Sequence, residues 1–141
     1  MLYKKYLKEM TGCPFCKTKD RIFKENSQAF LTYAKAPYHP DHLLVIPKRH
    51  VTSFFDLTKE EKQKIDDLVS IGTKILKKLK YTNFTILVRE GSKSNKSIPH
   101  LHYHLIPNIR MGDVDYKGKG RSILKDDEIA KLTKKINKIK I

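Results

Sequence analysis

The sequence predicts an α+β fold, in which an antiparallel sheet of about five strands carries one long helix and a helix near each end. Apolar runs typical of strands come in two pairs, 28–33 with 42–47 and 82–90 with 100–107, and a helical segment separates the pairs. Short polar connections within each pair favour antiparallel strands, because parallel strands need long crossovers. The 141 residues are enough for a single domain with one core.

The first ten residues predict a short helix, and both cysteines of the chain follow it. The apolar and aromatic residues that recur on one side of this helix are Tyr3, Tyr6, Leu7 and Met10. Gly12 ends the helix just ahead of Cys13-Pro14-Phe15-Cys16. With only two cysteines, a scaffold stapled by several disulfides is excluded.

The middle of the chain predicts a long helix between the two strand pairs. Thr58 and Glu61 have the capping-box spacing that begins a helix. The residues that then recur at helical intervals are Ile65, Leu68, Gly72, Ile75 and Leu79. The later strand pair is joined by residues 91–97, which predict a flexible polar loop.

The end of the chain, residues 114–141, predicts a basic tail that follows a domain over residues 1–113. From Asp126 onward the tail predicts an amphipathic helix with lysines on one face. The residues of its apolar stripe are Ile129, Leu132, Ile136 and Ile139. Such a stripe packs either on the same domain or on a second copy of the chain, and the pattern leaves both open.

The charge of the chain is strongly positive, because 30 Lys and Arg against 15 Asp and Glu leave a net charge of +15. Such a field attracts anions of any kind, including nucleotides and nucleic acid. The alternative is that the lysines only solvate the surface. No apolar run has the length of a membrane span, and the N-terminal segment has no secretory signal. We therefore expect a cytoplasmic protein with no membrane partner.

Three of the six histidines occupy alternate positions of the last predicted strand, and they are His100, His102 and His104. Alternate residues of a strand share a face, so the imidazoles lie on one side, about 7 Å apart. The residues between them, which point to the core, are Leu101, Tyr103 and Leu105. Two chemistries fit this face: metal ligation by neutral imidazole, or nucleophilic and acid–base catalysis near neutral pH.

Two blocks of the sequence resemble the histidine triad (HIT) superfamily of nucleotide hydrolases and transferases. HLHYHLI at 100–106 has the family's His-φ-His-φ-His-φ-φ form. APYHPDHLLVIPKRHV at 36–51 is similar to its upstream block, roughly Pro-Tyr-x-Pro-Gly-His-φ-φ-φ-φ-Pro-x-x-His. The resemblance covers about residues 13–113, with the two blocks in the family's order and separation. It implies the HIT-like α+β fold, a nucleotide substrate and a homodimer.

The resemblance implies catalysis by the histidines of this triad, His100, His102 and His104. The middle one, His102, would attack the α-phosphorus of a nucleoside 5′-phosphate derivative, and water would then hydrolyse the nucleotidyl-histidine intermediate. A backbone carbonyl of the triad strand would orient the other nitrogen of its ring. His104 would contact phosphate oxygens.

The loop ahead of the triad corresponds to the place where the family binds phosphate. Ser97 matches a phosphate-binding hydroxyl, with an ordinary loop serine as the alternative. Asn95 and Lys96 stand where relatives have Gly-Gln. Arg89 replaces an Asn or Gln, and a guanidinium there favours a polyphosphate substrate unless it pairs with Glu90.

The resemblance also implies a structural zinc site, because many HIT proteins bind zinc through residues that correspond to Cys13, Cys16, His50 and His100. Two cysteines and two histidines suit tetrahedral zinc, and the site would tie the N-terminal segment to the catalytic strand. The alternative is two free thiols, with His50 at the surface. We expect His42 to be structural and to hydrogen-bond the triad region.

The leading interpretation is a HIT hydrolase of nucleoside 5′-phosphate derivatives, with dinucleoside polyphosphates preferred and nucleoside phosphoramidates next. Ala34 stands where relatives carry an Asn or Asp on the ribose, so the ribose contact is either missing or supplied by other groups. One alternative is aprataxin-like removal of AMP from DNA ends, for which the positive charge would supply backbone affinity. Another is a nucleotide-binding module without catalysis.

Overall fold

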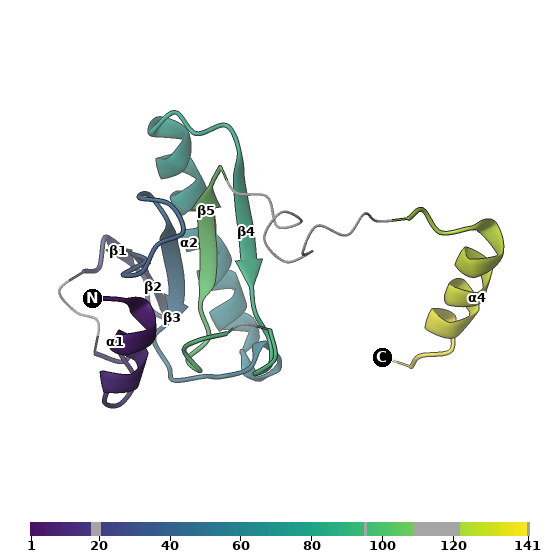
Figure 1. Ribbon diagram of the computed structural model, residues 1–141, viewed down its shortest axis with the longest axis horizontal. Coiled ribbons are helices and arrows are strands. Elements are labelled where there is room, and N and C mark those ends of the chain that lie inside the picture. The colour runs from purple at the N-terminus through teal and green to yellow at the C-terminus, as the bar shows by residue number, and fades with distance from the viewer. Residues whose placement is uncertain (18–20, 95, 109–121, 141) are drawn as a thin grey trace. The chain divides into compact units, whose positions relative to one another are not determined.

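A five-stranded antiparallel sheet organises residues 24–107 of the computed structural model, which describes residues 1–17, 21–94, 96–108 and 122–140 (Figure 1). The strands are β1 (Lys24–Glu25), β2 (Ala29–Tyr33), β3 (Leu43–Pro47), β4 (Phe84–Val88) and β5 (Tyr103–Pro107). Their order in the sheet is β1-β2-β3-β5-β4, and all neighbours are antiparallel. The predicted α+β class with about five strands is confirmed.

The last strand is shorter than the pattern predicted. β5 begins at Tyr103, and His100 and His102 lie in the irregular segment before it. The reason is that the N–H of Leu101 donates to the carbonyl of Val51 (2.8 Å) rather than to a strand neighbour. The two-residue strand β1 was not predicted, since two residues show no alternation.

The long helix α2 (Lys59–Lys78) begins where the capping pattern predicted. The Thr58 hydroxyl accepts from the Glu61 N–H (3.1 Å), and the Glu61 carboxylate accepts from the Thr58 N–H (2.9 Å). The buried face of the helix consists of Glu61, Ile65, Leu68, Gly72 and Leu76. The predicted stripe was therefore wrong at its end. Leu76 continues the stripe, while Ile75 is only partly buried and Leu79 is exposed at the C-cap.

Helix α2 approaches the sheet closely at Gly72. A Cβ added there would lie 2.3 Å from Cδ1 of Leu105, so a larger residue would overlap β5. Leu101 and Leu105 belong to the core on this side, and Tyr103 packs against it, as predicted. Because neighbouring residues of a strand face opposite ways, the contact of Leu105 with α2 directs His104 to the other face of the sheet.

That other face is covered by the N-terminal segment, which includes helix α1 (Tyr3–Glu9). The apolar cluster there consists of Phe15, Phe30, Ala34, Leu44, Ile46 and Ile98, and Leu7 packs against it. The side of the helix predicted from Tyr3, Tyr6, Leu7 and Met10 is half-buried. The three triad histidines are buried as well.

The C-terminal helix α4 (Asp126–Asn137) belongs to a second compact unit, residues 111–141, separate from residues 1–110. The predicted helix is present, and the residues of its apolar stripe are exposed. The partner of this stripe stays a prediction, and the predicted boundary at 113 lies outside the described residues. None of the helices described has the length and hydropathy needed to cross a membrane.

Candidate active site

A cavity of about 570 Å³ opens on the histidine-bearing face of the sheet. Its walls come from α1, the turn at 13–16, the segment 34–38 and the end of the loop at 91–98. The imidazoles that line it belong to His42, His102 and His104. These three side chains come from two segments of the chain, which the pairing of β3 with β5 brings side by side.

The imidazole of His102 has one nitrogen fixed and the other available. Nδ1 lies 2.9 Å from the carbonyl oxygen of His100. A carbonyl only accepts hydrogen bonds, so Nδ1 carries the proton and Nε2 carries the lone pair. The ring of Phe15 packs against the imidazole with 5.0 Å between the ring centroids. Burial lowers the pKa of His102 to about 4, so the ring is neutral near pH 7.

His104 belongs to a chain of hydrogen bonds that starts at the backbone of Tyr38. The Tyr38 N–H donates to Nδ1 of His42 (3.2 Å), so the neutral His42 ring carries its proton on Nε2. That nitrogen lies 2.9 Å from Nδ1 of His104, to which it donates. The proton of His104 is therefore on Nε2. The predicted hydrogen bond between His42 and the triad is confirmed.

The two histidines joined by these hydrogen bonds, His42 and His104, are both neutral in the free protein. Burial, together with the neighbouring imidazoles and the charge of Arg89, lowers the pKa of His42 to about 4 and that of His104 to about 2. The sequence interpretation did not place His42 in the cavity. Its position follows from the strand pairing, because residue 42 shares a strand face with Leu44, and Leu44 pairs with His104. The sequence alone does not give this register, so the position could not be predicted.

The imidazole of His100 contacts a different set of side chains and is not among the described residues that line the cavity. The possible ligand atoms of Cys13, Cys16, His50 and His100 all lie within 4.8 Å of one another. Nδ1 of His100 is 3.3 Å from Sγ of Cys13, and Nδ1 of His50 is 3.3 Å from Sγ of Cys16. The cluster predicted from sequence is therefore assembled, and it could hold a metal ion.

The protonation of His100 fits a metal ligand. Its Nε2 donates to the carbonyl of Pro47 (2.8 Å), so Nδ1 carries a lone pair on the side of the two thiols. Ligating histidines in metal sites are commonly held in this way by a carbonyl on the far nitrogen. The backbone of His100 has a second role, since its carbonyl fixes the His102 ring.

The N-terminal end of α2 holds the loop that carries His50. The Arg49 guanidinium binds both carboxylate oxygens of Glu61, at 2.7 and 3.1 Å. This pair, together with the cap at Thr58, holds the pKa of the Glu61 carboxyl below its usual value. The same glutamate thus caps the helix and anchors the residue next to His50.

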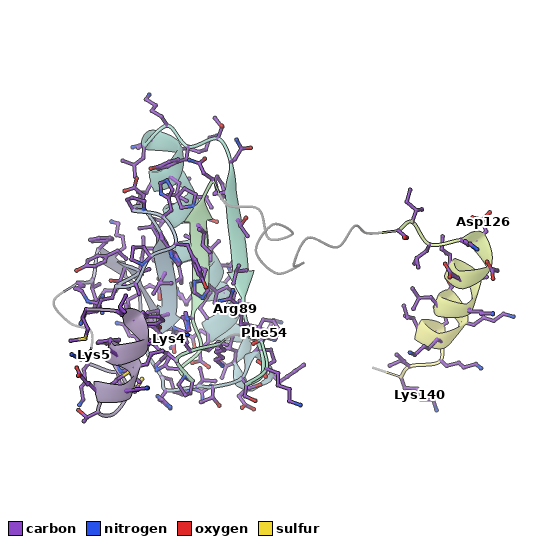
Figure 2. The ribbon with its side chains drawn as sticks, viewed as in Figure 1. Lys4, Lys5, Phe54, Arg89, Asp126 and Lys140 are labelled. Carbon is purple, nitrogen blue, oxygen red and sulfur yellow. The ribbon has the colours of Figure 1, made fainter. Side chains whose placement is uncertain are left out.

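Two of the predicted phosphate-binding side chains line the cavity. Ser97 lies there with its Oγ 2.7 Å from the phenol oxygen of Tyr3. Arg89, which follows β4 and is labelled in Figure 2, lines it as well. Among the described residues Arg89 makes no ion pair with Glu90, whose carboxylate instead accepts from the Ser53 hydroxyl (2.7 Å).

The other predicted residues of this region do not add groups to the cavity. Lys96 donates to the carbonyl of Thr52 and is not among the described lining residues, whereas Asn95 lies outside the described part of the chain. Ala34 lines the cavity and offers it no polar side-chain atom. The residues of α1 that line it, which the sequence interpretation missed, are Tyr3, Lys4, Tyr6 and Leu7.

An anionic phosphate ester is the ligand that suits a cavity with a neutral nucleophilic imidazole, an imidazole N–H and a guanidinium. Fold and site together thus define an α+β protein with a histidine-lined cavity suited to a phosphate ester. The chain belongs to the HIT domain family, whose model matches residues 17–111.

Individual relatives support this membership. The chain is 34% identical over 98 residues to the nitrilase and fragile histidine triad fusion protein NitFhit of Caenorhabditis elegans, covering 67% of this chain and 21% of that protein. It is 32% identical over 106 residues to the bifunctional bis(5′-adenosyl)-triphosphatase/adenylylsulfatase FHIT of Arabidopsis thaliana, covering 70% of this chain and 52% of that protein. The chain therefore spans about half or less of the length of these two relatives.

A solved structure shares the fold over nearly the whole chain. The crystal structure of a HIT family protein from Bacillus anthracis superimposes with a TM-score of 0.68 at 25% sequence identity, covering 92% of this chain and 98% of that one.

Proposed function

We propose that the protein hydrolyses nucleoside 5′-phosphate derivatives, dinucleoside polyphosphates above all, through a nucleotidyl intermediate on His102. The observation that carries this proposal is the hydrogen bond from Nδ1 of His102 to the His100 carbonyl, which leaves Nε2 as a free nucleophile beside the cavity. The relative from Arabidopsis thaliana, named a bis(5′-adenosyl)-triphosphatase, supports the choice of substrate.

The reaction takes two displacements at the same phosphorus. In the first, Nε2 of His102 forms a bond to the α-phosphorus, and the bond from that phosphorus to the leaving-group oxygen breaks, so the oxygen departs with the electron pair. In the second, water attacks the α-phosphorus and the P–N bond breaks. The electron pair returns to Nε2, a proton of the water passes to solvent, and the nucleoside monophosphate is released.

The state of His104 favours a phosphate leaving group over an amine. Its Nε2–H donates a hydrogen bond to a phosphate oxygen, but with a pKa of about 2 the ring carries no second proton to give near neutral pH. A polyphosphate departs as an anion and needs no proton. An amine must be protonated to leave, so a phosphoramidate requires a proton that His104 does not carry in the free protein. The positive charge of Arg89 supports the same choice.

We propose further that the ion held by Cys13, Cys16, His50 and His100 is zinc. Two thiolates and two imidazoles are a zinc donor set, and four protein ligands make a closed, structural site. When bound, the metal supplies a cross-link between the N-terminal segment and the segment that carries the nucleophile. The homodimer, the cytoplasmic location and the alternative activities stay predictions.

Hydrolysis of diadenosine tetraphosphate in ¹⁸O-labelled water tests the proposed reaction. Attack at the α-phosphorus places the label in AMP and leaves the ATP product unlabelled, as mass spectrometry of the separated products would show. Label in ATP would mean attack at another phosphorus. Absence of turnover would overturn the choice of substrate, and AMP-capped DNA ends and phosphoramidates would be assayed next.

Replacing His42 with alanine is expected to lower kcat by about tenfold to a hundredfold and to leave KM nearly unchanged. Without His42 nothing described holds the proton of His104 on Nε2, so the ring loses its donor toward the phosphate in part of the molecules. Steady-state kinetics of AMP release measure the effect.

His39→Ala is the matched control for this prediction. His39 lies in the same turn and contacts the ring of Tyr81, but it is not among the described residues lining the cavity. This variant should keep the wild-type rate. Equal losses in the two variants, or a rise in KM alone for His42→Ala, would contradict a positioning role for His42.

A further inference from the structure

The cavity carries more positive charge than the reacting phosphate requires. Its lining cations are Lys4, Arg21, Lys35 and Arg89, and the described lining residues include no Asp or Glu. The α-phosphate of a dinucleoside polyphosphate carries a single negative charge. Of the four lining cations, Arg89 is the one whose charge acts on the imidazoles of His42, His102 and His104, so we assign it to this phosphate. The remaining cations need another explanation.

Two of these cations lie against aromatic rings. The Arg21 guanidinium is 5.2 Å from the centroid of the Tyr33 ring, and the Lys35 ammonium is 4.7 Å from that of Tyr6. No hydrogen bond, ion pair or ring contact to another described residue is recorded for the side chain of Lys4. Lys4 is exposed and also lines the cavity, so its ammonium can reach a ligand at the mouth.

Lys4 is held near the phosphate-binding loop by its neighbour in α1. The phenol of Tyr3 is hydrogen-bonded to the hydroxyl of Ser97 at 2.7 Å, which connects the helix to the loop. Two hydroxyls that bond each other use one proton between them, and the second proton is left to donate to a ligand oxygen. This pair and the Lys4 ammonium therefore both present donors for anionic oxygens to the same cavity.

Core packing accounts for Leu7, which contacts the apolar cluster beneath α1, but not for the polar ends of Tyr3 and Lys4. The helix has no fully buried residue, although four of its residues line the cavity. It also precedes residues 17–111, the part of the chain that the HIT domain model matches. The contribution of α1 to the cavity thus comes from outside the matched domain.

We propose that α1 forms the subsite for the leaving group, in which Lys4 and the Tyr3–Ser97 hydroxyl pair bind the phosphates beyond the one attacked. This inference rests on the proposed hydrolysis and names the feature of the substrate that the chain selects: a leaving group that is itself a polyphosphate. A nucleotide whose leaving group lacks phosphates makes no use of the subsite.

Two substrates and two lysine variants test this subsite. Diadenosine tetraphosphate and the p-nitrophenyl ester of AMP are attacked at the same kind of α-phosphorus, but only the first releases a polyphosphate. Lys4→Met removes the proposed donor. Lys5→Met removes the same charge from the same helix, at a residue that pairs with Glu9 (3.9 Å) and is not among the described lining residues. Figure 2 labels both lysines on α1.

For Lys4→Met we expect kcat/KM for the tetraphosphate to fall about tenfold or more, as for the loss of a charged hydrogen bond. The same variant should keep kcat/KM for the ester within about twofold of the wild type. Lys5→Met should stay within about twofold for both substrates. Tyr3→Phe should lower kcat/KM for the tetraphosphate more than for the ester, since one hydroxyl of the pair is lost.

The outcomes separate the subsite from the proposed function. If the wild type hydrolyses both substrates but Lys4→Met matches Lys5→Met on the tetraphosphate, the subsite is overturned and the hydrolase stands. Equal losses of Lys4→Met on both substrates also overturn it, because they place Lys4 at the α-phosphate. A wild type that hydrolyses neither substrate overturns the proposed function, and the subsite with it.

Discussion

Replacing His102 with alanine is expected to lower AMP release from diadenosine tetraphosphate by about a thousandfold or more. The variant loses the lone pair on Nε2, which is the proposed nucleophile. His104 cannot take its place, because its hydrogen bond with His42 leaves an N–H, not a lone pair, on its other nitrogen. Chromatography of the products over time, with the variant and the wild type side by side, measures the effect.

Nucleotide binding distinguishes lost chemistry from lost structure in this variant. His102→Ala should bind a non-hydrolysable dinucleotide analogue with an affinity near that of the wild type, and its melting temperature should stay close as well. His39→Ala, outside the described cavity lining, is the control with full turnover. Turnover by His102→Ala within about tenfold of the wild type would place the nucleophile elsewhere. A wild type that binds the analogue yet turns over none of the candidate substrates would favour the non-catalytic module.

Loss of the metal cluster is expected to have the largest effect on stability. The Cys13→Ser, Cys16→Ser double variant should contain no stoichiometric zinc and should melt well below the wild type. A ligand present at about a thousand times its Kd stabilises the folded state by about 4 kcal/mol, which corresponds to a shift on the order of 10 °C for a domain of this size. Elemental analysis and thermal unfolding, with and without a chelator, measure both quantities.

Two histidines, one inside the metal cluster and one outside it, provide a matched pair of variants for this prediction. His50→Gln removes one ligand and should weaken zinc retention, whereas His39→Gln alters a histidine outside the cluster and should retain zinc as the wild type does. We expect lower AMP release from the double cysteine variant too, since Phe15, between the cysteines, packs against the His102 ring. A melting temperature that responds to neither chelator nor added zinc would favour two free thiols.

The elements that could be predicted from sequence are those whose signals are local. The start of α2 depends on Thr58 and Glu61, three residues apart, and the structure has both hydrogen bonds of that cap. The end of its buried stripe could not be predicted in the same way, because a 3.6-residue period allows either Ile75 or Leu76 to follow Gly72 on the buried face. The sheet decides for Leu76, which is fully buried against the core.

The residue types of the site could be predicted from sequence, but the strand pattern alone did not show how the three histidines divide between the metal cluster and the cavity. Alternation by itself placed His100, His102 and His104 on one face, and only the family resemblance assigned His100 to the zinc cluster and His102 to catalysis. In the structure the backbone before β5 is irregular, so the imidazole of His100 contacts the thiols while those of His102 and His104 line the cavity. The participation of α1 had no signal in the sequence beyond an amphipathic pattern.

The sequence by itself determined the order of the helices and of the strands other than β1, the capped start of α2, the Cys-x-x-Cys and triad spacings and the family resemblance, because each depends on motifs that are local in the chain. The tertiary structure decided which nitrogen of each histidine is free. His42 and His104 are 62 residues apart, and the bond between them exists because β3 pairs with β5 in one register. A hydrogen bond across paired strands fixes the proton on an imidazole, and that pairing is a property of the folded chain rather than of any local pattern.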